Sequence, residues 1–108
     1  STKQLRKAVH TWLDVIENLY GIKPIIYTGY SFKLKYLNDG TFDAYPYWIA
    51  HYYVEQLQYK GQWAFWQYTD MGRIDGINGS VDCNIFNGEL PQLVALTMKP
   101  EEIDEVGL

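Results

Sequence analysis

The chain has 108 residues, enough for one small domain with a modest core, and its 47% hydrophobic and 20% charged content is typical of a globular protein. The formal net charge is −4, but the acidic excess comes from four residues after Lys99, and the remainder has nine acidic and nine basic side chains. This neutral body argues against a nucleic acid as partner and against an anionic membrane surface.

The N-terminal part is predicted to form half of a βα repeat. Residues 1–20 carry apolar side chains at helical spacing, which predicts an amphipathic helix with one buried stripe. Ser1 and Gln4 fit a capping box at its start, and Gly21 fits a helix stop. Residues 24–28 are apolar on both faces, as parallel strands covered by helices tend to be. The predicted stripe consists of Leu5, Val9, Trp12, Leu13, Ile16 and Leu19.

Three further strands are predicted without a long helix between them. The remaining elements are a short helix at 30–38, strands at 46–52, 63–69 and 81–86, and a last helix at 89–98. We expect one domain over 1–99 and an acidic tail over 100–108. Four strands alone would leave open edges, which natural sheets avoid, so we expect an α/β fold that is part of an incomplete barrel. No signal peptide is visible, and the chain opens on a helix start, so upstream sequence is expected to be missing.

Aromatic and polar side chains concentrate on the last strands. The run Trp63–Asp70 precedes a strand that carries Asp82 and Asn84 two residues apart. Alternation places Asp82 with Asn84 on one strand face, and Trp48 with Tyr52 on one face of another strand. Aromatic faces beside a carboxylate are typical of a sugar-binding cleft. At the mouth of a barrel, ligand and water would satisfy polar groups that are costly to bury.

Simpler roles compete with this interpretation. Trp63 and Trp66, each taken alone, fit a core better than a ligand platform. Asp82 fits a turn or capping carboxylate equally well. His10 and His51 fit core or surface positions better than catalysis, because no Ser or Cys nucleophile pattern lies near them.

No metal or organic cofactor is predicted. Cys83 is the single cysteine, so no internal disulfide forms, and with His51 and scattered acids it makes no short-spaced zinc pair. Asp70, Asp75 and Asn78 suggest calcium only faintly, since their spacing is not that of an EF-hand.

Four segments in order resemble glycoside hydrolase family 25, the lysozymes (N-acetylmuramidases) of bacteria and phages that cleave peptidoglycan. They are Pro24–Thr28, Trp48–Tyr52, Trp63–Thr69 and Gly76–Asn84, and the resemblance, to the second half of the family domain, covers roughly residues 3 to 97. It implies a modified TIM-like β/α barrel whose last strands lack helices. It also implies peptidoglycan glycan strands as substrate, no cofactor, and a secreted or cell-envelope protein of bacterial or phage origin.

The resemblance also implies roles for individual residues. Asp82 matches the aspartate of the family motif Val-Asp-x-Asn and is the catalytic candidate. The implied substrate contacts are Tyr27, Trp48, Tyr52, Gln67 and Asn84.

The chain departs from the family pattern at the catalytic acid. The family carries it in an Asp-x-Glu motif upstream of the first helix, and no Asp-x-Glu occurs in these 108 residues. A further aspartate near the family's N-terminus is also absent. Glycoside hydrolysis needs a proton donor and a second group at the reacting carbon, so Asp82 supplies at most one role. We therefore expect the chain alone to be inactive and to need the N-terminal half of the same domain as partner.

Three hypotheses follow. The first is a muramidase that cleaves the β-1,4 bond between N-acetylmuramic acid and N-acetylglucosamine. The second is a non-catalytic module that binds cell-wall glycans, and the third is a purely structural fragment. An Asp-x-Glu at the end of a strand encoded upstream of Ser1 would separate the first from the second.

Overall fold

The computed structural model describes residues 1–99 and 101, so the predicted tail at 100–108 lies almost wholly outside the described residues. The elements in chain order are α1 (Thr2–Tyr20), β1 (Ile26–Gly29), α2 (Tyr30–Tyr36), a short 3-10 helix η1 (Gly40–Phe42), β2 (Tyr47–Ala50), β3 (Phe65–Gly72), β4 (Val81–Phe86) and α3 (Leu90–Ala95). The predicted order of helices and strands is confirmed. The bounds differ from the prediction at several elements: η1 was not expected, β2 ends at Ala50 rather than at residue 52, and β3 begins two residues later and runs on to Gly72. The two helices α2 and α3 are shorter than predicted, and β1 covers 26–29 instead of 24–28.

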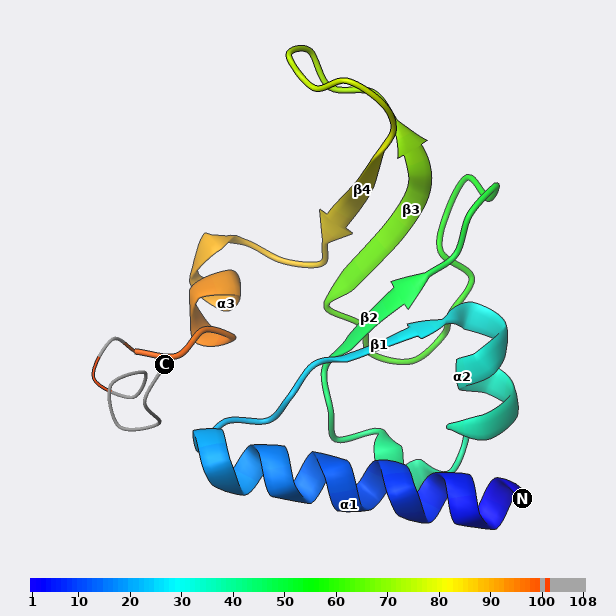
Figure 1. The fold of residues 1–108 in the computed structure, drawn as a ribbon, viewed down its shortest axis with the longest axis vertical. Helices are drawn as coiled ribbons and strands as arrows, with labels where there is room; N and C mark the ends of the chain where they lie inside the picture. The colour runs from blue at the N-terminus through cyan, green and yellow to red at the C-terminus, as the bar shows by residue number, and fades with distance from the viewer. Residues whose placement is uncertain (100, 102–108) are drawn as a thin grey trace.

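The four strands form one mixed sheet in the order β1-β2-β3-β4 (Figure 1). β1, β2 and β3 are parallel, and β4 returns antiparallel to β3 through a hairpin that projects at the top of the view. The carboxyl ends of the three parallel strands therefore share one edge of the sheet. This confirms an α/β fold with a four-stranded sheet.

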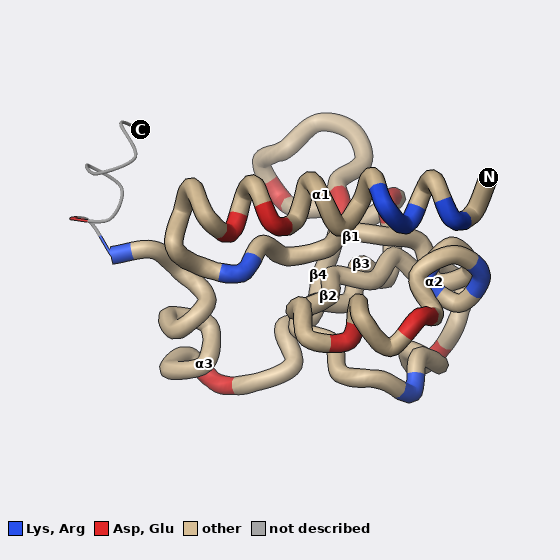
Figure 2. Tube along the Cα trace, turned by 90° about the horizontal axis from the view of Figure 1, so that it is seen from below, with Lys and Arg blue, Asp and Glu red and all other residues tan. Residues whose placement is uncertain are grey.

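Capping hydrogen bonds and packing stabilise α1, although its charged side chains are distributed unfavourably for the helix dipole. The Ser1 hydroxyl accepts from the Gln4 backbone N–H at 3.2 Å, the N-terminal amine donates to Gln4 Oε1 at 3.2 Å, and Gly21 closes the helix with φ of 70°. The basic residues of α1 lie in its N-terminal part and the acidic ones in its C-terminal part (Figure 2). That order is the reverse of what the helix dipole favours. The capping box and the buried face must therefore stabilise α1.

One face of the sheet packs on α1, η1 and the loop before β3. Leu13 of α1 is fully buried against Ile26, Phe42 and Ile49. The whole buried cluster consists of Leu13, Ile26, Leu37, Phe42, Tyr45, Tyr47 and Ile49. The other face of the sheet is not covered by this cluster, and it carries the side chains described below.

The prediction of a single buried stripe on α1 was wrong in part. Trp12 and Leu19 are 53% and 56% exposed, and Val15 is 57% exposed. Trp12 is one residue, about 100° of helix rotation, away from Leu13, which turns it out of the core. With Ala8, these residues form a second, outward-facing apolar stripe on α1: Ala8, Trp12, Val15 and Leu19.

Candidate functional site

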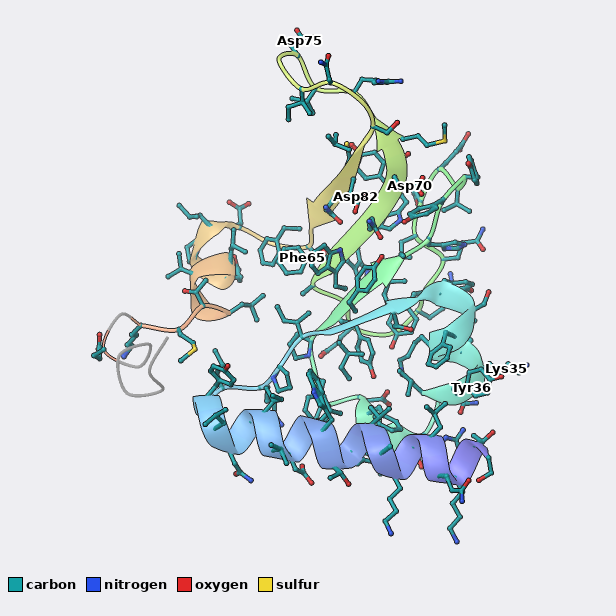
Figure 3. The ribbon with its side chains drawn as sticks, viewed as in Figure 1. Lys35, Tyr36, Phe65, Asp70, Asp75 and Asp82 are labelled. Atoms are coloured by element: carbon teal, nitrogen blue, oxygen red, sulfur yellow. The ribbon has the colours of Figure 1, made fainter. Side chains whose placement is uncertain are left out.

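An aromatic row crosses the uncovered face of the sheet. Strand register aligns Tyr27, Trp48, Phe65 and Phe86, one from each strand. Successive ring centroids are 5.2, 5.6 and 5.2 Å apart, and Phe65, labelled in Figure 3, is the third ring of the row. Since alternate residues of a strand point to opposite faces, this row lies opposite the buried Ile26 and its neighbours. The four rings make an apolar floor that continues across all four strands.

The next row toward the carboxyl edge carries two amides. Gln67 and Asn84 are directly opposite each other on β3 and β4. The Tyr27 hydroxyl donates to Gln67 Oε1, and Trp48 Nε1 donates to Asn84 Oδ1 at 2.8 Å. These bonds satisfy the oxygen of Gln67, which is only 3% exposed, and fix the orientation of both amides. Four of the predicted site residues therefore form two hydrogen-bonded pairs, which the edge-on contact of the Tyr27 and Trp48 rings brings side by side.

Tyr52 and Asp82 lie beyond these rows, at the carboxyl edge. Burial raises the pKa of the Tyr52 phenol to about 12, and Tyr27, Asp70 and Asp82 add to the effect, Tyr27 also through a hydrogen bond. Tyr52 therefore lies within electrostatic range of all three side chains. The structure thus brings together all six predicted residues, with Asp82 solvent-exposed at the start of β4.

Asp70 is a second carboxylate that alternation along β3 did not predict. Gln67 is paired with Asn84 but Thr69 is paired with Cys83, so a β-bulge inserts one extra residue between them. Asn84 and Cys83 point to opposite faces, and their partners Gln67 and Thr69 therefore do too. The bulge turns Asp70 onto the face of Gln67, beside Asp82 (Figure 3).

We expect the raised pKa of Tyr52 to appear in the alkaline stability of the chain. The phenol titrates at about 10 when unfolded and at about 12 when folded, so the folded state favours the neutral form. Its contribution is complete below pH 10 and is lost as the pH rises through 12. Tyr52→Phe should lose less stability than the wild type over this interval, as measured by thermal unfolding across the alkaline range. Equal losses in the two proteins would contradict the placement of Tyr52 beside these groups.

The two histidines and the tryptophans at 63 and 66 take no part in these hydrogen-bonded pairs. His51 points to the opposite face, where its ring stacks on Tyr30 with centroids 4.1 Å apart. His10 stacks on Phe42 at 4.0 Å. Trp66 is 8% exposed and donates to the His51 carbonyl at 2.8 Å, and Trp63 packs on the core, so both belong to the covered side.

The described residues contain no group of three or more His, Cys, Asp or Glu side chains that could hold a metal ion. Asp75 lies at the tip of the hairpin, away from Asp70 and Asp82 (Figure 3). Within residues 1–99 and 101, none of the helices has both the length and the apolar character needed to cross a membrane.

The uncovered face can bind a ring that is apolar on one side and rich in hydroxyl groups at its rim. Aromatic faces supply apolar contact, and ordered amide and phenol groups supply hydrogen bonds. Two carboxylates, Asp70 and Asp82, lie at the edge where the parallel strands end. This is the combination expected for a carbohydrate site with acid–base or charge-stabilising groups beside it.

Comparison with known proteins points to the same chemistry. The family model described as glycosyl hydrolases family 25 matches residues 1–77. An uncharacterized Escherichia coli K12 protein, YegX, is 49% identical over 96 residues, which cover 88% of this chain and 35% of YegX. Lysozyme M1 of Streptomyces globisporus is 33% identical over 105 residues, which cover 89% of this chain and 34% of that protein.

A solved bacterial lysozyme from Streptomyces coelicolor has a similar structure, with a TM-score of 0.81 and 33% identity. The match covers 89% of this chain and 46% of the lysozyme chain. The chain thus spans about a third of the length of its curated relatives and under half of this solved structure.

Proposed function

This chain belongs to glycosyl hydrolases family 25, and on that basis we propose that it is the C-terminal half of a peptidoglycan-cleaving muramidase domain. The proposed reaction is hydrolysis of the β-1,4 bond between N-acetylmuramic acid and N-acetylglucosamine. Residues 1–99 would contribute four strands to a modified TIM-like barrel, closed by the N-terminal half of the domain. The proposed location is the bacterial cell envelope or outside the cell, with a bacterial or phage origin.

The hydrogen bond between Trp48 Nε1 and Asn84 Oδ1, directly below the carboxylate edge, is the observation that carries this proposal. It joins the row of four aromatic rings to the row that carries the two amides, so a sugar ring lying on Trp48 would reach Asn84 and Asp82 together. Tyr27 and Gln67 repeat the arrangement one strand pair away. In the proposed site, these four residues and Tyr52 hold the glycan, and Asp82 acts on the reacting sugar.

Asp82 would supply one of the two catalytic roles. Glycoside hydrolysis requires a proton donor at the leaving oxygen and a second group that stabilises, traps or orients the reacting centre. An exposed carboxylate beside the Tyr52 phenol suits the second role, because it can orient the substrate or stabilise positive charge at the reacting carbon. The proton donor would come from an Asp-x-Glu in the N-terminal half, since this chain has none.

A glycan-binding module without catalysis is the second candidate. The arrangement of the site favours it, because the aromatic floor and both amides would serve binding alone equally well. Binding to purified cell walls without any release of reducing ends, even after the N-terminal half is supplied, would support this candidate over the muramidase.

We expect the isolated 108 residues to show no lytic activity on bacterial cell walls. Co-expression with the part of Lysozyme M1 that precedes the matched segment should restore it, because that part would close the sheet edges and supply the acid. The measurement is clearing of a cell-wall suspension together with release of reducing ends. Lysis by the isolated chain would contradict the division of roles, and the matched control is the Lysozyme M1 part expressed alone.

A further inference from the structure

Tyr53 has a backbone conformation that a tyrosine adopts only at a cost. It follows Tyr52 directly, and its φ is 59°, the only positive value at a non-glycine position among the described residues. For a bulky side chain this left-handed conformation is a genuine outlier, because the Cβ approaches the backbone oxygen. Glycine would adopt it freely.

Packing does not explain why a tyrosine occupies this position. The side chain is 91% exposed, the highest value among the exposed large hydrophobic residues. Its hydroxyl lies 3.9 Å from the sulfur of Met71, which is itself 65% exposed. Neither side chain gains much burial from the contact. Strain that brings no packing in return is found mainly at functional positions.

Tyr53 and Met71 are the chain neighbours of two site residues. Tyr52 interacts electrostatically with Asp70. Tyr53 follows Tyr52 and Met71 follows Asp70, and these two residues are also in contact. The pair therefore sits at the carboxyl edge, one step outside the carboxylates. A long, exposed aromatic ring beside a thioether offers a flat apolar surface to anything that leaves the site in that direction.

We propose that Tyr53, supported by Met71, is a platform for an additional sugar ring of the glycan strand, outside the rings that contact Trp48 and Asp82. This inference rests on the proposed function. The nearby carboxylates Asp70 and Asp82 disfavour an acidic peptide there, because like charges repel, whereas an uncharged sugar ring can stack on the phenol. The platform would make binding depend on the length of the glycan.

Binding of N-acetylglucosamine oligomers to the 108-residue chain tests this inference. The probes are the dimer and the pentamer, and the variants are Tyr53→Gly and Tyr53→Phe. We expect Tyr53→Gly to bind the pentamer about tenfold more weakly and the dimer as before, while Tyr53→Phe keeps both affinities because the ring is retained. We also expect Tyr53→Gly to raise the Tm, since glycine removes the backbone strain.

Each other outcome has a distinct meaning. Unchanged pentamer binding by Tyr53→Gly, or an equal loss for both oligomers, would overturn the platform and leave the proposed function standing. A lower Tm of Tyr53→Gly would show that the ring serves packing and would also overturn it. If the wild-type chain binds neither oligomer, the proposed function fails first and the platform fails with it.

Discussion

Replacing Asp82 with asparagine, in a domain completed by the N-terminal half, should lower the rate of glycan cleavage by about 100- to 1,000-fold. The substitution keeps the shape of the side chain and removes the charge and the ability to exchange a proton. Asp82 is exposed, so the fold should not suffer from the change. The rate is measured as reducing ends released from purified peptidoglycan by the chain combined with its N-terminal half, and binding to the same material should stay close to normal.

Asp75→Asn is the matched control for this prediction. Asp75 is an exposed carboxylate on the same hairpin, but it lies at the tip, away from Asp70 and Asp82. Its removal should leave the rate unchanged. Asp70→Asn should give an intermediate loss, because Asp70 shares the site face but has no place in the family motif. If Asp82→Asn cleaves as fast as the wild type, the chain is a structural or binding element and not part of a catalytic centre.

The elements could be predicted because their signals are local. Helical spacing over 1–20, the capping pair Ser1 and Gln4, and the strand alternation each depend on residues near one another in sequence. Alternation also placed Asp82 with Asn84, because β4 is regular over these positions, whereas Tyr52 lies beyond the end of β2 at Ala50. The family resemblance then added Tyr27 and Gln67, which the structure joins by a hydrogen bond.

Asp70 could not be found in this way because its orientation depends on a partner strand. The bulge between Gln67 and Thr69 arises in the pairing of β3 with β4, and a second register shift follows between Thr69 and Gly72. β3 also runs on to Gly72, three residues past the end that the alternation predicted. A strand read alone carries no sign of such a shift. Irregular pairing next to a candidate site is therefore where sequence alternation should be trusted least.

The strained Tyr53 was equally invisible to sequence reasoning. If the alternation of β2 continued, Tyr53 would lie with Ile49 and His51 on the face that packs on the core. The strand ends at Ala50, and the positive φ of Tyr53 turns its side chain into solvent. A glycine at this position would have indicated a positive φ, whereas a tyrosine gives no such indication. Both missed residues, Asp70 and Tyr53, lie at the carboxyl edge, where regular strand pairing stops and alternation no longer determines the direction of a side chain.

The largest loss of stability is expected from Leu13→Ala in α1. Leu13 is fully buried against the sheet, and truncating a leucine in a packed core costs about 3 kcal/mol through lost transfer energy and the cavity left behind. That is a large share of the total for a domain of this size. Urea unfolding followed by circular dichroism should show a lower midpoint, with the slope little changed.

Trp12→Ala is the matched control, because Trp12 is adjacent to Leu13 on the same helix and has the larger side chain. It is 53% exposed, so its removal should cost about 1 kcal/mol or less in the isolated chain. The order of these two effects is the reverse of what side-chain size alone would give. A loss from Trp12→Ala as large as that from Leu13→Ala would contradict the two-stripe description of α1.

The two substitutions should differ again once the N-terminal half is present. Ala8, Trp12, Val15 and Leu19 form an apolar stripe that this chain leaves exposed, and a neighbouring helix of a closed barrel would cover it. Trp12→Ala should then weaken recovery of lytic activity on mixing with the N-terminal half, although it barely affects the chain alone. Leu13→Ala should reduce recovery only in proportion to the fraction of chain that is unfolded. Equal recovery by Trp12→Ala and wild type would show that the stripe is not covered when the domain closes.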